Sequence, residues 1–188
     1  MKFYLTLFMG LTWNAVFAQT TSDCRVDIYL VKKFIPCWDS TSKRIMPFTV
    51  TLNDLQDTAF IKNEEIISYT FKKFKQKVRK GRKVSVKLHS IQTSSSLNKR
   101  IDSLHLSLFG CAKQFAIVCN GSIVYSGCLN NRLSSWVPPT VFATGRDNEL
   151  TLNLWLSVAP NDPRENQTLF NCLKKSGRFK FMNKYDDE

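Results

Sequence analysis

Apolar and polar residues alternate along three short stretches of the chain, with the period of two that β-strands show. The alternating apolar positions are Val26, Ile28 and Leu30; then Phe48, Val50 and Leu52; and finally Leu150, Leu152, Leu154, Leu156 and Val158. Each stretch is therefore expected to form a strand that buries one face in the core. The tail that begins at Arg178 is expected to add a short strand before it frays.

A hairpin is expected around Asn120-Gly121, because two β-rich runs flank a dipeptide that tolerates the positive φ of a type I′ turn. The residue pairs that follow from this turn are Val118 with Ile123, Ala116 with Tyr125 and Lys113 with Cys128. Cys111 is then a diagonal neighbour of Cys128 on the same face. A disulfide between these two cysteines is one pairing that the hairpin allows.

A second hairpin is expected between Tyr69 and Leu88, where two period-two runs flank a polar tip that contains Gly81. The second of these runs is expected to point Val84, Val86 and Leu88 into the core and Ser85 and Lys87 out of it. In the first run, Phe74 and Val78 break the alternation. We therefore expect the first strand to fray or bend before the tip.

Two segments change to the periodicity of a helix. Leu97, Ile101, Leu104 and Leu108 recur on one helical face and predict a helix over about residues 96–109. A second helix is predicted over 163–176, with Asp162 as its N-cap and Gly177 at its end. Taken together, the patterns predict an α+β domain with a mostly antiparallel sheet of about six to eight strands and these two main helices.

The first eighteen residues have the order of a secretory signal peptide. Lys2 precedes an apolar stretch that runs to about Phe17, and Val16 and Ala18 occupy the −3 and −1 positions of a small-residue cleavage site. The stretch is shorter than the roughly 20 apolar residues of a membrane-spanning helix. We therefore expect residues 1–18 to be removed and residues 19–188 to form one exported domain, periplasmic or extracellular, with no later membrane span.

The chain is strongly basic, with a formal net charge of +12, and the charge is concentrated between Phe71 and His89, where nine of nineteen residues are Lys or Arg and none is acidic. In an exported protein such a run favours an anionic lipid or glycan over nucleic acid. A charged edge that prevents strand-to-strand aggregation is the first interpretation of this run, and contact with an anionic envelope surface is the second. The candidate contact residues of this run are Lys72, Lys73, Phe74, Lys75, Lys77, Arg79, Lys80, Arg82 and Lys83. Trp136 is a candidate contact residue on a second surface.

All six cysteines follow the expected cleavage site: Cys24, Cys37, Cys111, Cys119, Cys128 and Cys172. An even number in an oxidising compartment indicates disulfides, although six cysteines allow 15 pairings. Buried free thiols are the alternative. A metal site is not expected, because the chain has no C-x-x-C motif and its two histidines, His89 and His105, lack the spacing of zinc ligands.

No catalytic or cofactor-binding motif is present: the chain has no G-x-S-x-G elbow, no Walker loop and no H-E-x-x-H. The acidic pair Glu64-Glu65 consists of adjacent residues, whose side chains diverge on regular structure and do not form an acid/base couple. We therefore expect no cofactor and no catalytic residues. An enzyme built from scattered residues would have to gather His89, His105, Tyr125 and the glutamates around one pocket.

Four stretches of the chain carry a resemblance: "DIYLVKK", "DLQDTAFIKNEEIISYTF", "FAIVCNGSIVYSGCLNNRLSSWVPP" and "DPRENQTLFNCLKKSGRF". They resemble uncharacterised families of small exported proteins of the bacterial cell envelope. The matching positions are Glu64, Glu65, Ile67, Tyr69, Phe115, Gly121, Val124, Tyr125, Gly127, Ser134, Ser135 and Pro138. The basic insertion around 72–83 and the many cysteines depart from that pattern. The resemblance implies an α+β domain in the cell envelope and assigns no catalytic residue.

These observations predict a small exported binding protein that contacts an anionic envelope component, lipid headgroup or acidic glycan, through the basic hairpin. An inhibitor or immunity-type partner of one specific protein is the second hypothesis, because it fits the size and the cysteines equally well. An envelope enzyme with scattered catalytic residues is the third.

Overall fold

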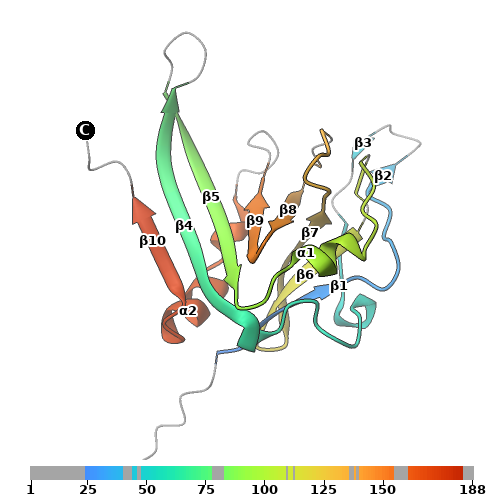
Figure 1. The fold of residues 1–188 in the computed structure, drawn as a ribbon, viewed down its shortest axis with the longest axis horizontal. Helices are drawn as coiled ribbons and strands as arrows, with labels where there is room; N and C mark the ends of the chain where they lie inside the picture. The colour runs from blue at the N-terminus through green and yellow to red at the C-terminus, as the bar shows by residue number, and fades with distance from the viewer. Residues whose placement is uncertain are drawn as a thin grey trace, which may run out of the picture.

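The computed structural model describes residues 24–39, 44–45, 48–77, 83–108, 110–111, 113–135, 138, 140–154 and 161–183. In this part of the chain, eight strands form one curled sheet (Figure 1), and two more form a short ribbon, β2 (Trp38–Asp39) with β3 (Arg44–Ile45). In spatial order the strands of the sheet are β1 (Val26–Leu30), β6 (Lys113–Cys119), β7 (Ser122–Leu129), β8 (Val141–Arg146), β9 (Glu149–Asn153), β5 (Lys83–Thr93), β4 (Ile66–Lys77) and β10 (Phe179–Asn183).

The sheet is mixed, so the expectation of a mostly antiparallel sheet is wrong, although the coarser α+β class fits. β7 pairs with β8 and β4 pairs with β10 in parallel, whereas the other neighbours are antiparallel. Alternation along a strand shows which face is buried, but it carries no information about the direction of the neighbour. The short terminal strand was expected from the sequence; its parallel pairing beside β4 was not.

The described residues contain two α-helices, α1 (Asn98–Asp102) and α2 (Gln167–Lys175), and the 3₁₀ turns η1 (Leu52–Asp54), η2 (Asn63–Glu65) and η4 (Pro163–Glu165). The helix predicted over 163–176 is confirmed in its main part as η4 followed by α2. Its cap differs, because Asp162 caps η4 and Asn166 caps α2 by accepting from Thr168 N and Leu169 N.

The helix predicted over 96–109 is wrong in length, since α1 ends at Asp102. His105 follows with φ of 48°, in the left-handed region that stops a right-handed helix, and Leu108 is 46% exposed. Leu97 and Ile101 do pack on the core. Gly145 of β8 makes room for this contact, because a Cβ there would stand 1.9 Å from Ile101 Cδ1.

The main core lies on one face of the sheet, and α2 packs into it with Leu169, Phe170, Cys172 and Leu173. Val26, Ile28 and Leu30 are all buried, which confirms the first predicted strand. The strand predicted around Phe48–Leu52 is wrong. That segment runs as an irregular chain into η1, and its Val50, with Leu55, covers the other face of β1 and β6 in a second apolar cluster.

The Asn120-Gly121 turn is confirmed, with φ of 49° and 77° at the two residues. Val118 pairs with Ile123 as expected, but a bulge in β7 then shifts each later pair by one residue, so that Gln114, and not Lys113, lies opposite Cys128. The expected pairs of Ala116 and Lys113 are therefore wrong. A bulge leaves no simple mark in the pattern of apolar residues.

Candidate functional site

The β4–β5 hairpin projects beyond the rest of the sheet (Figure 1). Its register is continuous from Ser68 opposite Gln92 to Lys77 opposite Lys83, so the first strand does not fray as far as Lys77. The other expected possibility, a bend before the tip, is not tested by this register. β10 accompanies β4 as far as Lys73, and β9 accompanies β5 from His89. Among the described strands, the outer part of the hairpin is thus a two-stranded ribbon with both edges uncovered.

The two faces of this hairpin differ in chemistry along its length. At its base, one face places Tyr69, Phe71, His89 and Ile91 in the core. Further out, the same face carries a set of lysines that we call the lysine face: Lys73, Lys75, Lys77, Lys83 and Lys87. The opposite face carries partly exposed apolar side chains that we call the apolar strip: Phe74, Val84, Val86 and Leu88.

The expectation that Val84, Val86 and Leu88 point into the core is therefore wrong. They alternate correctly among themselves, but His89 and Ile91 lie on the other face of the same strand. At its base, β5 lies next to β9 and α2, and there the residues that face the core are His89 and Ile91. The outer residues lie beyond the core, so nothing forces their apolar members onto the core face.

Electrostatically, the lysine face is a dense row of like charge. Lys73 lies opposite Lys87 and Lys77 opposite Lys83, and neither strand contains an acidic residue. Like charges directly opposite each other destabilise a strand pair. One partial compensation is the ion pair between Lys87 Nζ and Glu165 Oε1, at 2.5 Å. A polyanion placed along this face would be attracted by its positive charge.

The predicted contact residues divide between the two faces. Lys73, Lys75, Lys77 and Lys83 belong to the lysine face, whereas Lys72 and Phe74 lie on the opposite face beside Leu88 and Val86. Arg79, Lys80, Arg82 and Trp136 lie outside the described residues.

At the base of the lysine face lies a buried polar cluster that sequence reasoning missed. His89 is fully buried; its ring stacks on Phe71 at 4.4 Å between centroids, and its Nδ1 lies 2.9 Å from Tyr69 Oη. Its Nε2 has no hydrogen-bond partner among the described groups. Burial, reinforced by the nearby Arg164 cation, lowers the pKa of His89 to about 3. The imidazole is therefore neutral at physiological pH.

Arg164, in η4, supplies the charge of this cluster although it is only 2% exposed. Its guanidinium bonds Asp162 Oδ2 at 2.7 Å and donates to the Leu152 carbonyl at 2.8 Å. Burial acts to raise the pKa of Asp162, but the hydrogen bonds from Arg164 outweigh it and hold that pKa below its usual value. The burial of Arg164 could not be predicted from the sequence, because an arginine after a proline at a helix start is usually exposed.

Two groups of side chains in the described part of the chain have the spacing of metal ligands. In the first, ligand atoms of His89, Asp162 and Glu165 lie within 4.8 Å of one another. Arg164 and Lys87 already pair with the two carboxylates, so this cluster is charge-compensated without a metal ion. The second is Cys24, Cys119 and Cys172, two of which are joined in a disulfide.

The residues that a scattered active site would need do not converge. His89 and Tyr125 are both buried in the core, but Glu65 lies elsewhere, in an ion pair with Arg100, and His105 is exposed. Hydrogen bonding to Arg100 lowers the pKa of Glu65 to about 2. The Glu65–Arg100 pair thus fastens η2 to α1.

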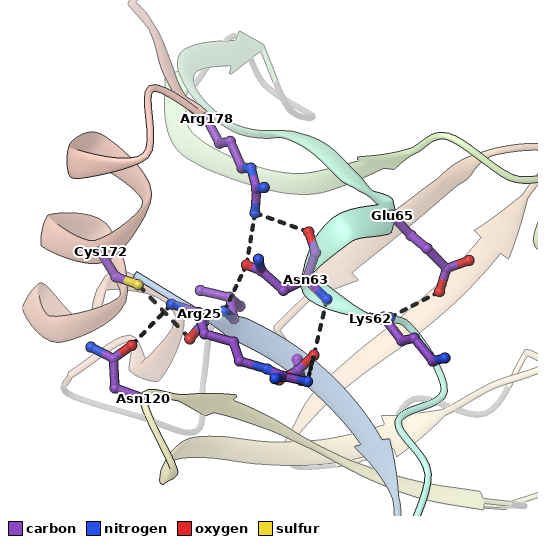
Figure 2. Close-up of polar contacts among 9 residues, drawn as sticks. Arg25, Lys62, Asn63, Glu65, Asn120, Cys172 and Arg178 are labelled. Carbon is purple, nitrogen blue, oxygen red and sulfur yellow. Dashed lines mark hydrogen bonds and ion pairs between the residues drawn. The ribbon is translucent and has the colours of Figure 1, made fainter. Parts of the chain in front are cut away.

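Next to this pair, Asn63 joins three parts of the chain (Figure 2). Its Oδ1 accepts from Val26 N at 3.0 Å and from Arg178 Nη1 at 2.7 Å, and its own N–H donates to Asp27 Oδ1 at 2.9 Å. The start of β1, the turn η2 and the segment after α2 are therefore held together by one side chain.

Four of the six candidate cysteines form two bridges, Cys24–Cys172 and Cys111–Cys128. The second is the pairing that the Asn-Gly hairpin allowed. Cys37 and Cys119 are buried thiols, and burial raises the pKa of each. The thiol form of both therefore predominates at neutral pH.

The comparisons with known proteins add no relative to this picture. A scan of the chain against models of known protein families found no match, and a search of curated protein sequences found none either. In the part of the chain that the structure describes, no helix has the length and apolar character needed to cross a bilayer.

Proposed function

We propose that this protein is an exported binding protein that attaches to an anionic membrane surface of the cell envelope through the β4–β5 hairpin. The observation that carries the proposal is the two-faced outer hairpin, with the lysine face on one side and the apolar strip on the other. The two cysteine bridges are compatible with export into an oxidising compartment.

The combination of charge and apolar side chains favours a lipid surface. Cationic side chains near an anionic bilayer each contribute about 1 kcal/mol of binding energy, while apolar side chains gain by entering the headgroup boundary. An acidic glycan would use the lysine face but would leave Phe74, Val84 and Val86 in water. The neighbouring strand β10 adds two exposed apolar residues, Phe181 at 54% and Met182 at 48%.

Sedimentation with lipid vesicles tests this proposal. The full chain should bind vesicles containing phosphatidylglycerol and should not bind vesicles of phosphatidylcholine alone, and the binding should weaken as salt is raised. In the variant Lys75→Glu/Lys77→Glu, we expect the affinity to fall at least about 30-fold, since two contacts of about 1 kcal/mol each are lost. The matched control, Lys33→Glu/Lys99→Glu, makes the same change of charge at two exposed positions elsewhere and should bind nearly as wild type.

A second variant separates lipid from glycan. Val84→Ser/Val86→Ser leaves every charge in place but makes the apolar strip polar. It should weaken vesicle binding and leave binding to heparin, an acidic glycan, unchanged. Equal vesicle binding by wild type and by both hairpin variants would disprove attachment through the hairpin. Binding to heparin without any binding to vesicles would replace the lipid with a glycan.

A further inference from the structure

Three cysteine sulfurs meet where the beginning, the middle and the end of the described chain come together. Cys24 precedes β1, Cys119 ends β6 and Cys172 lies on α2. Their Sγ atoms all lie within 4.8 Å of one another. Cys24 and Cys172 are bonded across 148 positions of sequence, and Cys119 carries the remaining thiol.

Backbone and side-chain contacts fix this arrangement. Val26 pairs with Cys119 across β1 and β6. Beyond that pair, Asn120 N donates to Arg25 O at 2.9 Å, and Arg25 N donates to Asn120 Oδ1 at 2.9 Å. Figure 2 shows Arg25 between Asn120 and Cys172, whose Sγ lies 4.0 Å from Arg25 O. These contacts therefore hold the thiol of Cys119 beside the Cys24–Cys172 bridge.

A thiolate next to a disulfide is the reactant pair of thiol–disulfide exchange. We propose that Cys119, Cys24 and Cys172 form an exchange site, in which the bridge moves from Cys24–Cys172 to Cys119–Cys172. The Cys119 thiolate attacks Cys172 Sγ, the new S–S bond forms, the old one breaks, and the electron pair leaves on Cys24. No external oxidant or reductant is consumed, because one thiol and one disulfide are present before and after.

The direction follows from exposure. Cys119 is 1% exposed and Cys172 3%, whereas Cys24 is partly exposed at the start of the described chain. A departing thiolate is stabilised by water, so Cys24 is the better leaving group. Exchange therefore transfers the free thiol from the interior to a residue that external reagents reach. It also separates Cys24 from α2, while α2 stays tied to the sheet through the new bond to Cys119 at the end of β6.

The obvious test is to map the bridges by non-reducing peptide mass spectrometry after trapping free thiols with N-ethylmaleimide. After incubation at pH 8.5, wild-type protein should show a Cys119–Cys172 bridge and trapped Cys24. At pH 6 the fraction of this bridge should be smaller, because exchange requires the thiolate. The control Cys37→Ser removes the other buried thiol, which has no such sulfur neighbours among the described residues, and should leave the map unchanged.

The variant Cys24→Ser gives the decisive result, because it leaves Cys119 and Cys172 as the two remaining thiols of the site. In a glutathione redox buffer, most molecules should form Cys119–Cys172, and an intact Cys111–Cys128 bridge should report that the hairpin has folded and the buffer oxidises. Unbridged Cys119 and Cys172 beside an intact Cys111–Cys128 would overturn the proposal. A Cys24–Cys119 bridge in Cys172→Ser under the same conditions, with Cys24→Ser unbridged, would overturn the proposed direction. Neither result bears on vesicle binding.

Discussion

The base and the outer part of the β4–β5 hairpin use the same two strands in one continuous register, yet they have opposite chemistry. At the base, Tyr69 and Phe71 contact His89, Phe170 and the partly buried Phe179 in one aromatic group. In the outer part, the same face carries the row of lysines. The neighbours of the strands, and not the strands themselves, make the difference: β9, β10 and α2 surround the base and end before the outer part.

This contrast separates stability from function. Residues at the base are held by dense packing, so changing them should cost folding energy. The described residues of the outer part are intermediate or exposed, so changing them should cost less folding energy and should mainly affect binding. Three variants test how far this separation extends.

The largest effect is expected for Phe71→Ala. Phe71 stacks on His89 and also contacts Phe170 and Phe181 at 5.9 Å and 5.3 Å between ring centroids. Removing a packed ring leaves a cavity, so we expect the free energy of unfolding to fall by about 3–4 kcal/mol in urea titrations. The control Phe181→Ala removes a ring that is 54% exposed and should cost less than about 1 kcal/mol. Similar losses for the two variants would contradict the proposed difference in packing.

An intermediate effect is expected from the protonation of His89. Its pKa is about 3 in the folded protein and about 6.5 when unfolded, so the unfolded state takes up the proton first as pH falls. The stabilisation is complete above the unfolded value and is lost between pH 6.5 and 3. Between pH 8 and pH 5 the loss should be about 2 kcal/mol.

The variant His89→Phe keeps a ring against Phe71 but does not titrate. Its free energy of unfolding, measured by urea titration at each pH, should change much less than that of wild type from pH 8 to pH 5. Glu65 does not confound the test, since its pKa of about 2 places its contribution below about pH 4.5. Parallel pH profiles for wild type and variant would show that His89 is not the titrating group.

The smallest effect is expected for Phe74→Ala. This residue is three positions from Phe71 on the same strand, but it lies on the apolar strip opposite Val86 and is partly exposed. We expect a loss of less than about 1 kcal/mol in the same urea titration. A loss comparable to that of Phe71→Ala would mean that the outer hairpin is packed against the body of the protein and is not a free binding surface.

The sequence predicted those features that depend on local pattern. The first strand, the Asn120-Gly121 turn, α2 and the hairpin itself follow from alternation, turn chemistry and capping. The errors arose where distant segments decide the outcome. Val84 and Val86 alternate correctly but have no core beside them, and Val50 is buried without being in a strand.

The candidate site could be predicted only in part. The basic run was evident, but its separation into a lysine face and an apolar strip needs the register of β4 against β5. The cluster around Arg164 needs the packing of η4 on the sheet, which no local pattern encodes. The neighbourhood of Cys119 likewise depends on three elements that are far apart in sequence.

The parallel pairing of β10 with β4 has a consequence for how the chain reaches its final form. The partner of Tyr69 and Phe71 at this edge comes from residues 179–183, so this edge of β4 stays open until these residues have been synthesised. A chain that stopped before Phe179 would leave this edge of β4 unpaired beside an aromatic surface, where another chain could pair with it. The pairing of β10 with β4 therefore protects this edge against pairing with another chain.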